Sequence, residues 1–360
     1  MPAFEQHLTF MVRSIRAFLN LEAGVTRGGN EPLPMRADLV RQLEEARREL
    51  ESRDRMPAEL RARPVTTGTE TRGINPENIV WIFGSGRTGS TWLSSMMGDM
   101  EGHALWGEPW VGSLFGNFYY RAVDKRRRNS KQFIMGRYRE TWLGAIRNFV
   151  LDIAGTVFPT LSGDEYLVIK EPNGSIGAPL MMEAMPESRM ILLVRDPRDV
   201  VASSMDGKSE GGWNFEKNKQ LYLEGRKRSS SEDPDNFAKQ RAKRFLEGMG
   251  KAKEAYDAHK GPKVLVRYEE LRSDTLGTMK RMYSTLGIEV DEGELERVIE
   301  KHDWENIPED QKGQGKVFRK ATPGGWREDL TPEQAEVVAK ITAPLLKELY
   351  PDEARIEGSL

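Results

Sequence analysis

Nine small, hydroxylated and charged residues directly follow a short apolar segment. The apolar segment, residues 79–83, consists of β-branched and aromatic residues, and apolar residues return at helical spacing from Leu93 onward. The run between them reads Gly84-Ser85-Gly86-Arg87-Thr88-Gly89-Ser90-Thr91-Trp92. A strand, a glycine-rich turn and a helix N-terminus in this order can bind an anion through backbone N–H groups. The sequence therefore predicts a phosphate-binding loop, with an ordinary structural turn as the alternative.

The loop lacks the lysine of a nucleoside-triphosphate site. In the pattern G-x-x-x-x-G-K-[ST] a lysine follows the last glycine, whereas Ser90 follows Gly89 in this chain. The cation lies earlier, at Arg87, and the order Arg87 to Thr91 resembles the 5′-phosphosulfate loop of sulfotransferases that use 3′-phosphoadenosine 5′-phosphosulfate (PAPS). The resemblance implies that Arg87 clamps the 5′-phosphate, while Ser90 and Thr91 donate hydroxyl groups. The implied binding stretch is Gly86, Arg87, Thr88, Gly89, Ser90, Thr91 and Trp92, with the indole of Trp92 as a stacking face for adenine.

A second motif begins at another apolar segment, residues 192–194, and continues through Asp196-Pro197 into a helical pattern. Arg195 ends the apolar segment, and Ser203 follows eight residues later. The pair resembles the arginine and serine that bind the 3′-phosphate in the same family. The alternative is a structural ion pair between Arg195 and Asp196 or Asp199.

Two later segments complete the resemblance. Residues 317–327 resemble the family segment R-K-G-x-x-G-x-W, in which arginine, lysine and backbone amides close over the 3′-phosphate. Arg319 and Lys320 match it, and Ala321 stands where the family has its first glycine. Residues 264–271 resemble a strand that ends in Tyr-Glu-[DE]-Leu, which places Tyr268 near the adenine; packing in the core is the alternative. Together the motifs identify the chain as a member of the PAPS-dependent sulfotransferases.

The resemblance also directs the search for a general base, which in this family is a histidine or a glutamate. The candidates are Glu108, followed by Pro109, and Glu171, which follows Lys170. We favour Glu108, because carbohydrate-type enzymes have a similar Glu-Pro pair after the helix that follows the phosphate loop. Lys170 resembles the lysine beside the transferring sulfuryl group, and with Arg87 it would stabilise the leaving oxygen. His103 is interpreted as an ordinary surface histidine.

The elements that must position these residues alternate along the chain. Apolar segments at 79–83, 166–169, 190–194 and 264–266 are separated by amphipathic stretches. This alternation predicts an α/β fold, a three-layer sandwich with a central parallel sheet and ligands at the carboxyl ends of the strands. The resemblance implies the P-loop-like sulfotransferase version of that fold, over residues 76–352.

Composition excludes several classes of partner. The 54 basic and 56 acidic residues give a net charge of −2, so no overall field favours nucleic acid. The chain has no cysteine and 4 histidines, so no thiolate or zinc site is expected and no metal is required. Fixed cations at Arg87, Lys170, Arg195 and Arg319 would serve in place of a metal.

An N-terminal helical extension and linker are expected over residues 1–75, and a tail over 353–360. Apolar residues recur at helical spacing between Phe4 and Leu19, which indicates packing on the core or on a second subunit, with membrane-surface binding as the alternative. A homo-oligomer through these helices is therefore one expectation. No apolar run approaches the ~18 residues of a membrane span, and the chain is expected in the cytoplasm.

The expected function is transfer of a sulfuryl group from PAPS to a hydroxyl of a carbohydrate, glycolipid or other small molecule, leaving 3′-phosphoadenosine 5′-phosphate (PAP). The aromatic residues between 114 and 159 could line the acceptor site, or they belong to the core. Residues 206–235 are interpreted as a solvated loop, with a lid as the alternative. The competing functions are a phosphotransferase of the P-loop class and a nucleotide-binding module without catalysis.

Overall fold

The computed structural model describes residues 74–350, except 124–127, 129, 131–132, 137, 225–227, 317–318 and 321. All of the described residues lie in one compact unit, Glu70–Leu360. The predicted N-terminal helices, the C-terminal tail and Ala321 fall outside the described residues.

A five-stranded parallel sheet forms the centre of this unit, with the order β2-β3-β1-β4-β5. Its strands are β1 (Ile79–Phe83), β2 (His103–Gly107), β3 (Tyr166–Lys170), β4 (Arg189–Val194) and β5 (Lys263–Arg267). The four predicted strands are all present. Sequence reasoning missed β2, a short edge strand whose residues are mostly only partly buried and which ends in glycine. The parallel α/β fold is therefore confirmed.

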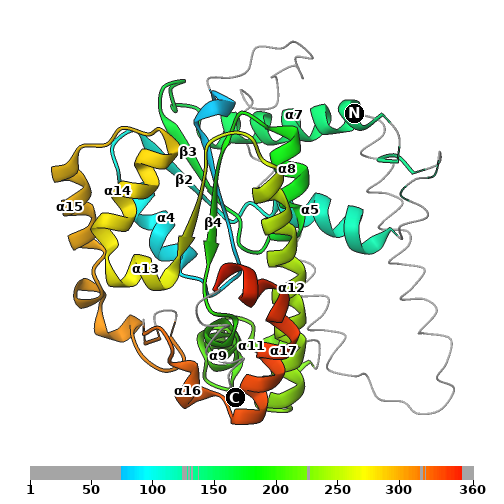
Figure 1. The fold of residues 1–360 in the computed structure, drawn as a ribbon, viewed down its shortest axis with the longest axis vertical. Coiled ribbons are helices and arrows are strands. Elements are labelled where there is room, and N and C mark those ends of the chain that lie inside the picture. Colours follow the sequence, from blue (N-terminus) through cyan, green and yellow to red (C-terminus); the bar gives the residue numbers. More distant parts are fainter. Residues whose placement is uncertain are drawn as a thin grey trace, which may run out of the picture. The chain divides into compact units, whose positions relative to one another are not determined.

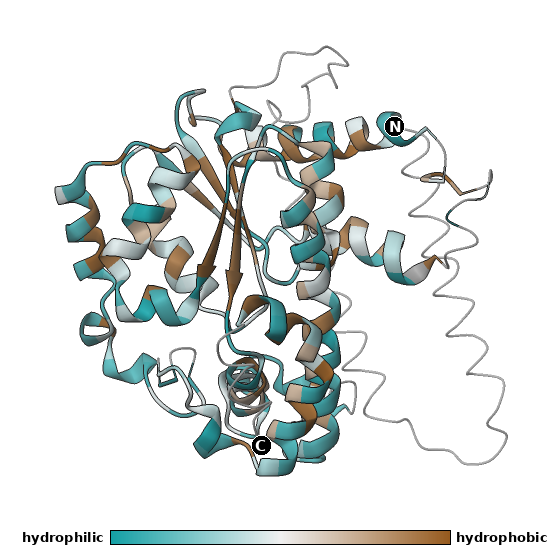
Figure 2. Cartoon of the chain, viewed as in Figure 1, coloured by the Kyte–Doolittle hydropathy of each residue, from teal (hydrophilic) through white to brown (hydrophobic). Residues whose placement is uncertain are grey.

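Helices cover both faces of the sheet (Figure 1). One face carries α4 (Ser90–Gly98), α13 (Tyr268–Ser273), α14 (Thr275–Leu286) and α15 (Glu292–Lys301), and the other carries α7 (Arg139–Val157), α8 (Ala178–Ala184) and α12 (Pro234–Ala258). Successive strand residues supply the two cores alternately: Val80 and Ile82 pack on the first face, and Ile79 and Trp81 on the second. Figure 2 shows the strands as a brown apolar centre between helices that are teal on their outer sides.

The remaining elements lie mainly around the carboxyl ends of the strands. They are α5 (Val111–Gly116), η2 (Asn117–Ala122), α9 (Pro197–Lys208), α10 (Trp213–Lys217), α11 (Lys219–Leu223), α16 (Trp326–Asp329) and α17 (Pro332–Leu349), with short turns η1 (Pro76–Asn78), η3 (Ser175–Gly177), η4 (Trp304–Asn306) and η5 (Glu309–Gln311). The prediction of a solvated loop over residues 206–235 is wrong in part, because the helices α10 and α11 lie within it. Ser230 also ties this segment back to α9, since its hydroxyl donates to the Met205 carbonyl at 2.6 Å.

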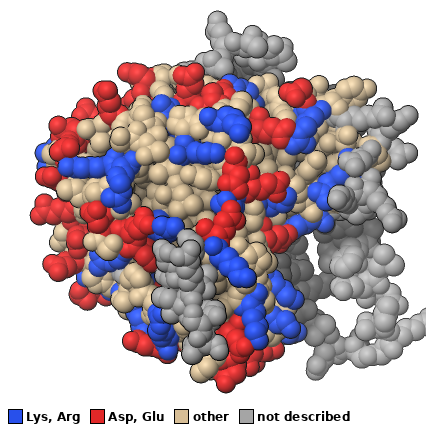
Figure 3. All heavy atoms as spheres, in the orientation of Figure 1, with Lys and Arg blue, Asp and Glu red and all other residues tan. Residues whose placement is uncertain are grey.

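Charged residues of both signs are interspersed over the surface that Figure 3 shows, in keeping with the near-zero net charge. Within the described part of the chain, no helix combines the length and apolar character needed to cross a membrane.

Candidate active site

The phosphate loop connects β1 to α4 through left-handed backbone at two residues. Arg87 has φ of 79° and Gly89 has φ of 85°. Such a backbone turns successive N–H groups toward one side, which favours anion binding. The loop is held from within, because the Thr88 hydroxyl donates to the Ser85 carbonyl at 2.7 Å. A Cβ at Gly84 would lie 2.8 Å from the Leu193 carbonyl oxygen, so the chain can pass β4 only as glycine.

Tyr268 packs directly on this loop at the end of β5. A Cβ at Gly89 would lie 2.6 Å from the Tyr268 ring, and the Arg195 guanidinium carbon lies 4.2 Å from the ring centroid. Tyr268 is buried and also lines the pocket described below. Tyr268 therefore packs in the core and also faces the pocket, and its place near the adenine stays a prediction.

Three guanidinium groups converge beside the loop. Arg87 Nε donates to Ser203 Oγ at 3.0 Å, and Arg195 Nη1 donates to the Arg87 carbonyl at 3.1 Å. Burial, together with the neighbouring charges of Arg195 and Arg319, lowers the pKa of Arg87 to about 10. Arg195 Nε is buried and has no hydrogen-bond partner within the described residues. A polyanionic ligand would offset the charge of these clustered cations and accept a hydrogen bond from the buried Arg195 Nε.

The segment after Arg319 is fixed to α9 through a buried carboxylate. Asp199 accepts hydrogen bonds from the backbone N–H groups of Gly324 at 2.8 Å and Trp326 at 2.9 Å. The same carboxylate lies 3.7 Å from Arg195, so the structural ion pair considered as an alternative is present as well. Arg319 pairs with Asp329 at 2.7 Å. Asp199 thus connects Arg195 of the second motif to the segment that follows Arg319.

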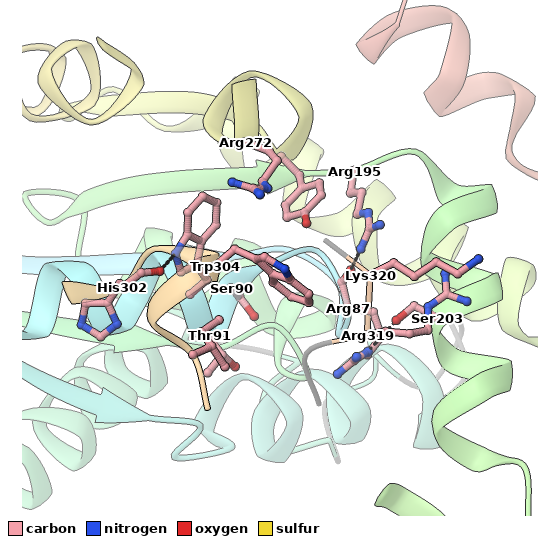
Figure 4. A pocket seen from close by; sticks show the side chains of 14 residues that line it. Arg87, Ser90, Thr91, Arg195, Ser203, Arg272, His302, Trp304, Arg319 and Lys320 are labelled. Atoms are coloured by element: carbon pink, nitrogen blue, oxygen red, sulfur yellow. Dashed lines mark hydrogen bonds between the residues drawn. The ribbon is translucent and has the colours of Figure 1, made fainter. Parts of the chain in front are cut away.

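A pocket joins these motifs (Figure 4). Its cationic end contains Arg87, Arg195, Arg319 and Lys320, and its other end contains His302 and Trp304. Its lining consists of Arg87, Gly89, Ser90, Thr91, Trp92, Arg195, Ser203, Tyr268, Arg272, His302, Trp304, Ile307, Arg319 and Lys320. Sequence reasoning missed Arg272, His302, Trp304 and Ile307, which lie outside the four motifs.

The aromatic end is assembled from two distant segments. The Trp92 indole N–H donates to the His302 carbonyl at 2.9 Å, which joins α4 to the turn after α15. Arg272 lies 6.0 Å from the Trp92 ring centroid. Trp304, at the start of η4, adds a second indole to the same end of the pocket. A flat aromatic ligand such as adenine fits this chemistry.

Glu108 and Lys170 meet beside the phosphate loop. Parallel pairing of β2 with β3 aligns their carboxyl ends, and the Glu108 N–H donates to the Lys170 carbonyl at 2.8 Å. Lys170 Nζ lies 2.9 Å from Glu108 Oε1 and donates to Thr91 Oγ1 at 3.2 Å. Asn173 donates to Glu108 Oε2 at 2.8 Å. Glu108 has a left-handed φ of 55°, and its side chain is 32% exposed, so a ligand can reach the carboxylate.

Glu171, the residue after Lys170, is buried and only 1% exposed. A Cβ at Gly174 would lie 1.6 Å from Glu171 Oε2, so the carboxylate fills space that glycine leaves. Burial raises the pKa of Glu171 to about 7, and the nearby backbone amides of residues 110–112 offset part of the increase. None of these amides makes a well-aligned hydrogen bond to either carboxylate oxygen. The structure therefore separates an accessible carboxylate from a buried one.

Two other sequence interpretations have clear outcomes. His103 lies at the start of β2, partly buried and stacked on Tyr166, and burial lowers its pKa. The prediction of a surface histidine is therefore wrong in part, although His103 is also outside the pocket.

Among the aromatic residues between 114 and 159, those packed against the core are Phe115, Tyr119, Tyr120, Phe133, Trp142 and Phe158. Phe118 and Phe149 are exposed.

The comparison with protein families classifies the second half of the chain. Residues 178–350 match the model of the sulfotransferase domain. These residues form a sulfotransferase domain. The matched residues include the segments 192–203, 264–271 and 317–327. The phosphate loop, Glu108 and Lys170 precede them. The contact between Arg87 and Ser203 connects the two parts. The predicted class, a PAPS-dependent sulfotransferase, is thereby confirmed.

The comparison with solved structures finds other sulfotransferases. The chain is similar to sulfotransferase STF9 from Mycobacterium avium at 13% identity and a TM-score of 0.47, covering 76% of this chain and 77% of that one. It is similar to mouse sulfotransferase SULT7A1, solved with PAP, at 12% identity and a TM-score of 0.43, covering 79% and 89%. A sulfotransferase from Alicyclobacillus acidocaldarius matches at 13% identity and a TM-score of 0.42, covering 75% and 94%. No curated protein sequence matches the chain.

A search for groups of three or more His, Cys, Asp or Glu side chains able to hold a metal ion finds none among the described residues.

Proposed function

We propose that this sulfotransferase moves a sulfuryl group from PAPS to a hydroxyl of a small molecule or glycan, with Glu108 as general base. The observation that carries the proposal is the contact chain from Glu108 through Lys170 to Thr91 of the phosphate loop. These contacts hold the partly exposed carboxylate of Glu108 next to the phosphate loop. Glu171 is too buried to meet an acceptor.

The pocket fits a nucleotide with phosphates at both ends of its ribose. The phosphate loop and Lys170 would hold the 5′-phosphosulfate, and Arg195, Ser203, Arg319 and Lys320 would hold the 3′-phosphate. Trp92 and Trp304 would bind the adenine. The orphan Arg195 Nε supports the fit, because a buried donor without a partner can bind a phosphate oxygen. The backbone contact predicted for Ala321 stays a prediction.

In the proposed reaction, Glu108 accepts the proton of the acceptor hydroxyl as its oxygen attacks sulfur. A new oxygen–sulfur bond forms as the bond between sulfur and the phosphate oxygen breaks, and PAP departs. Lys170 and Arg87 stabilise the charge that develops on the departing oxygen. Positioned cations in a partly buried site are effective because they need no rearrangement during the reaction.

The acceptor site would begin at Glu108 and extend along α5. Trp110, Leu114 and Phe118 are 56%, 56% and 46% exposed, and they lie directly before α5, within α5 and in η2. Trp110 also has a left-handed φ of 65°, directly after the Glu108-Pro109 pair. Among carbohydrates, glycolipids and other small molecules, this surface favours an acceptor with an apolar part next to its hydroxyl.

The test compares Glu108→Gln with Glu171→Gln, using labelled PAPS and a panel of phenols, alkyl glycosides and free sugars. Glu108→Gln should lower kcat by about 10²–10⁴-fold, as loss of a general base does. Its Kd for PAP should stay within about threefold of the wild type. Glu171→Gln should retain transfer. Full activity of Glu108→Gln would exclude it as the base.

A thermal-shift titration tests nucleotide choice separately. PAP should raise Tm, and ATP with magnesium should not; the opposite result would favour a phosphotransferase. The domain limits at residues 76 and 352, association through the N-terminal helices and the cytoplasmic location stay predictions.

A further inference from the structure

Arg241 of α12 reaches the back of the phosphate loop. Its Nη2 donates to Ser85 Oγ at 2.8 Å and to the Gly86 carbonyl at 2.9 Å. Its Nε donates to Ser204 Oγ of α9 at 3.0 Å. One guanidinium therefore joins the loop to two helices, and neither the sequence motifs nor the proposed site includes it.

The bond to the Gly86 carbonyl fixes the orientation of the next peptide N–H. A trans peptide unit is planar, so its C=O and N–H point in opposite directions. With the Gly86 oxygen turned toward Arg241, the N–H of Arg87 points to the opposite side of the loop from α12. Arg87 also has the left-handed φ of 79° that a residue with a side chain adopts only at a cost. Arg241 thus holds the strained peptide in the orientation that presents N–H groups to an anion.

The charge of Arg241 has no acidic partner among the described side chains. Its hydrogen bonds go to two hydroxyls and one carbonyl, and burial together with Arg244 and Arg87 lowers its pKa to about 10. It remains a cation at neutral pH. An uncompensated cation behind the loop adds positive potential in front of it, where the loop would meet a phosphate.

We infer that Arg241 is a positioning residue for the 5′-phosphate group of the nucleotide, acting through the Gly86–Arg87 peptide without touching the ligand. The inference rests on the proposed function, because it assumes that the loop binds the 5′ end and that Arg195 and Arg319 bind the 3′ end. It predicts that loss of Arg241 weakens binding of the 5′-phosphate and leaves binding of the 3′-phosphate unchanged.

The experiment measures Kd by calorimetry for three ligands: PAP, adenosine 5′-monophosphate and adenosine 3′-monophosphate. Arg241→Met should raise Kd about tenfold or more for the two ligands that carry a 5′-phosphate, and less than twofold for the 3′-monophosphate. KM for PAPS should rise while KM for the acceptor stays unchanged. Arg241→Lys, which keeps the charge but not the forked contact, should give a smaller loss with the same preference.

Arg244→Met is the matched control, because Arg244 lies one turn along α12, is exposed and carries the same charge. It should leave all three Kd values within twofold of the wild type. Equal weakening of all three ligands by Arg241→Met, or an equal effect of Arg244→Met, would overturn the inference. If Arg241→Met does not fold, the same comparison with Arg241→Lys decides. A wild-type protein that binds no PAP would overturn both this inference and the proposed function.

Discussion

Replacing Glu171 by Gln should stabilise the protein at alkaline pH and change its stability much less at pH 5. The pKa of Glu171 rises from an ordinary value of 4.5 to about 7 in the folded chain, chiefly through burial. Between these values the folded state holds a proton that the unfolded state releases. Stability is therefore greatest below pH 4.5 and falls as pH rises toward 7. Gln keeps the shape of the protonated acid and does not ionise.

The size of the stability change follows from the size of the pKa shift of Glu171. Each pKa unit corresponds to about 1.4 kcal/mol, so the full cost of ionising Glu171 in the fold is about 3 kcal/mol. About 2 kcal/mol of this cost is incurred between pH 5 and pH 8. For a protein of this size, that difference corresponds to a shift of about 5 °C in Tm.

The assay is thermal and urea unfolding of wild type and variant at pH 5, 6, 7 and 8. Subtracting the wild-type curve cancels the other titrating groups, and the gain from Glu171→Gln should grow from pH 5 to pH 7 and level off toward pH 8. Glu140→Gln, on the exposed side of α7, serves as the control for removal of a carboxylate and should give no such slope. A stability gain that is equal at pH 5 and pH 8 would refute the assigned pKa shift.

Two further predictions concern the ends of the pocket. Trp304→Ala should weaken PAP binding by about tenfold or more, since loss of a base-stacking ring costs about 1–3 kcal/mol; calorimetry that shows an unchanged Kd would remove Trp304 from the adenine site. Gly89→Ala should abolish measurable PAP binding, because the new Cβ would lie 2.6 Å from the Tyr268 ring at a φ of 85°. The matched change Gly248→Ala on α12, where nothing lies within 4 Å, should leave binding unaltered.

The phosphate loop was predictable because its information is local. A strand, glycines, a cation and a helix follow one another in the sequence, and the structure has them in that order. The strands before Lys170 and Arg195 were predictable for the same reason, since both are runs of buried apolar residues. Parallel pairing then brings their carboxyl ends to one edge of the sheet, so the motifs could be placed together before any coordinates were known.

Trp304 and Arg241 were not predictable, because their roles depend on contacts across long separations. Trp304 reaches the pocket through a turn fastened by the bond between Trp92 and the His302 carbonyl, 210 residues apart. Arg241 contacts Ser85 across a separation of 156 residues. On sequence alone Arg241 is one cation among several on a charged helix. The choice between Glu108 and Glu171 likewise depends on burial, which neighbouring sequence does not reveal.

The near-zero net charge of the chain hides a strong local imbalance, and this imbalance defines the site. Acidic and basic residues are mixed over the visible surface, yet Arg87 is crowded by Arg195 and Arg319 and has a depressed pKa. Asp199 and Asp329 offset part of that charge, and Arg195 Nε is left without a partner in the described structure. Cations held this close repel one another, and an anionic ligand relieves the repulsion. Ligand affinity and thermal stabilisation should therefore both rise with the number of phosphates bound and fall with added salt, because one electrostatic term underlies them.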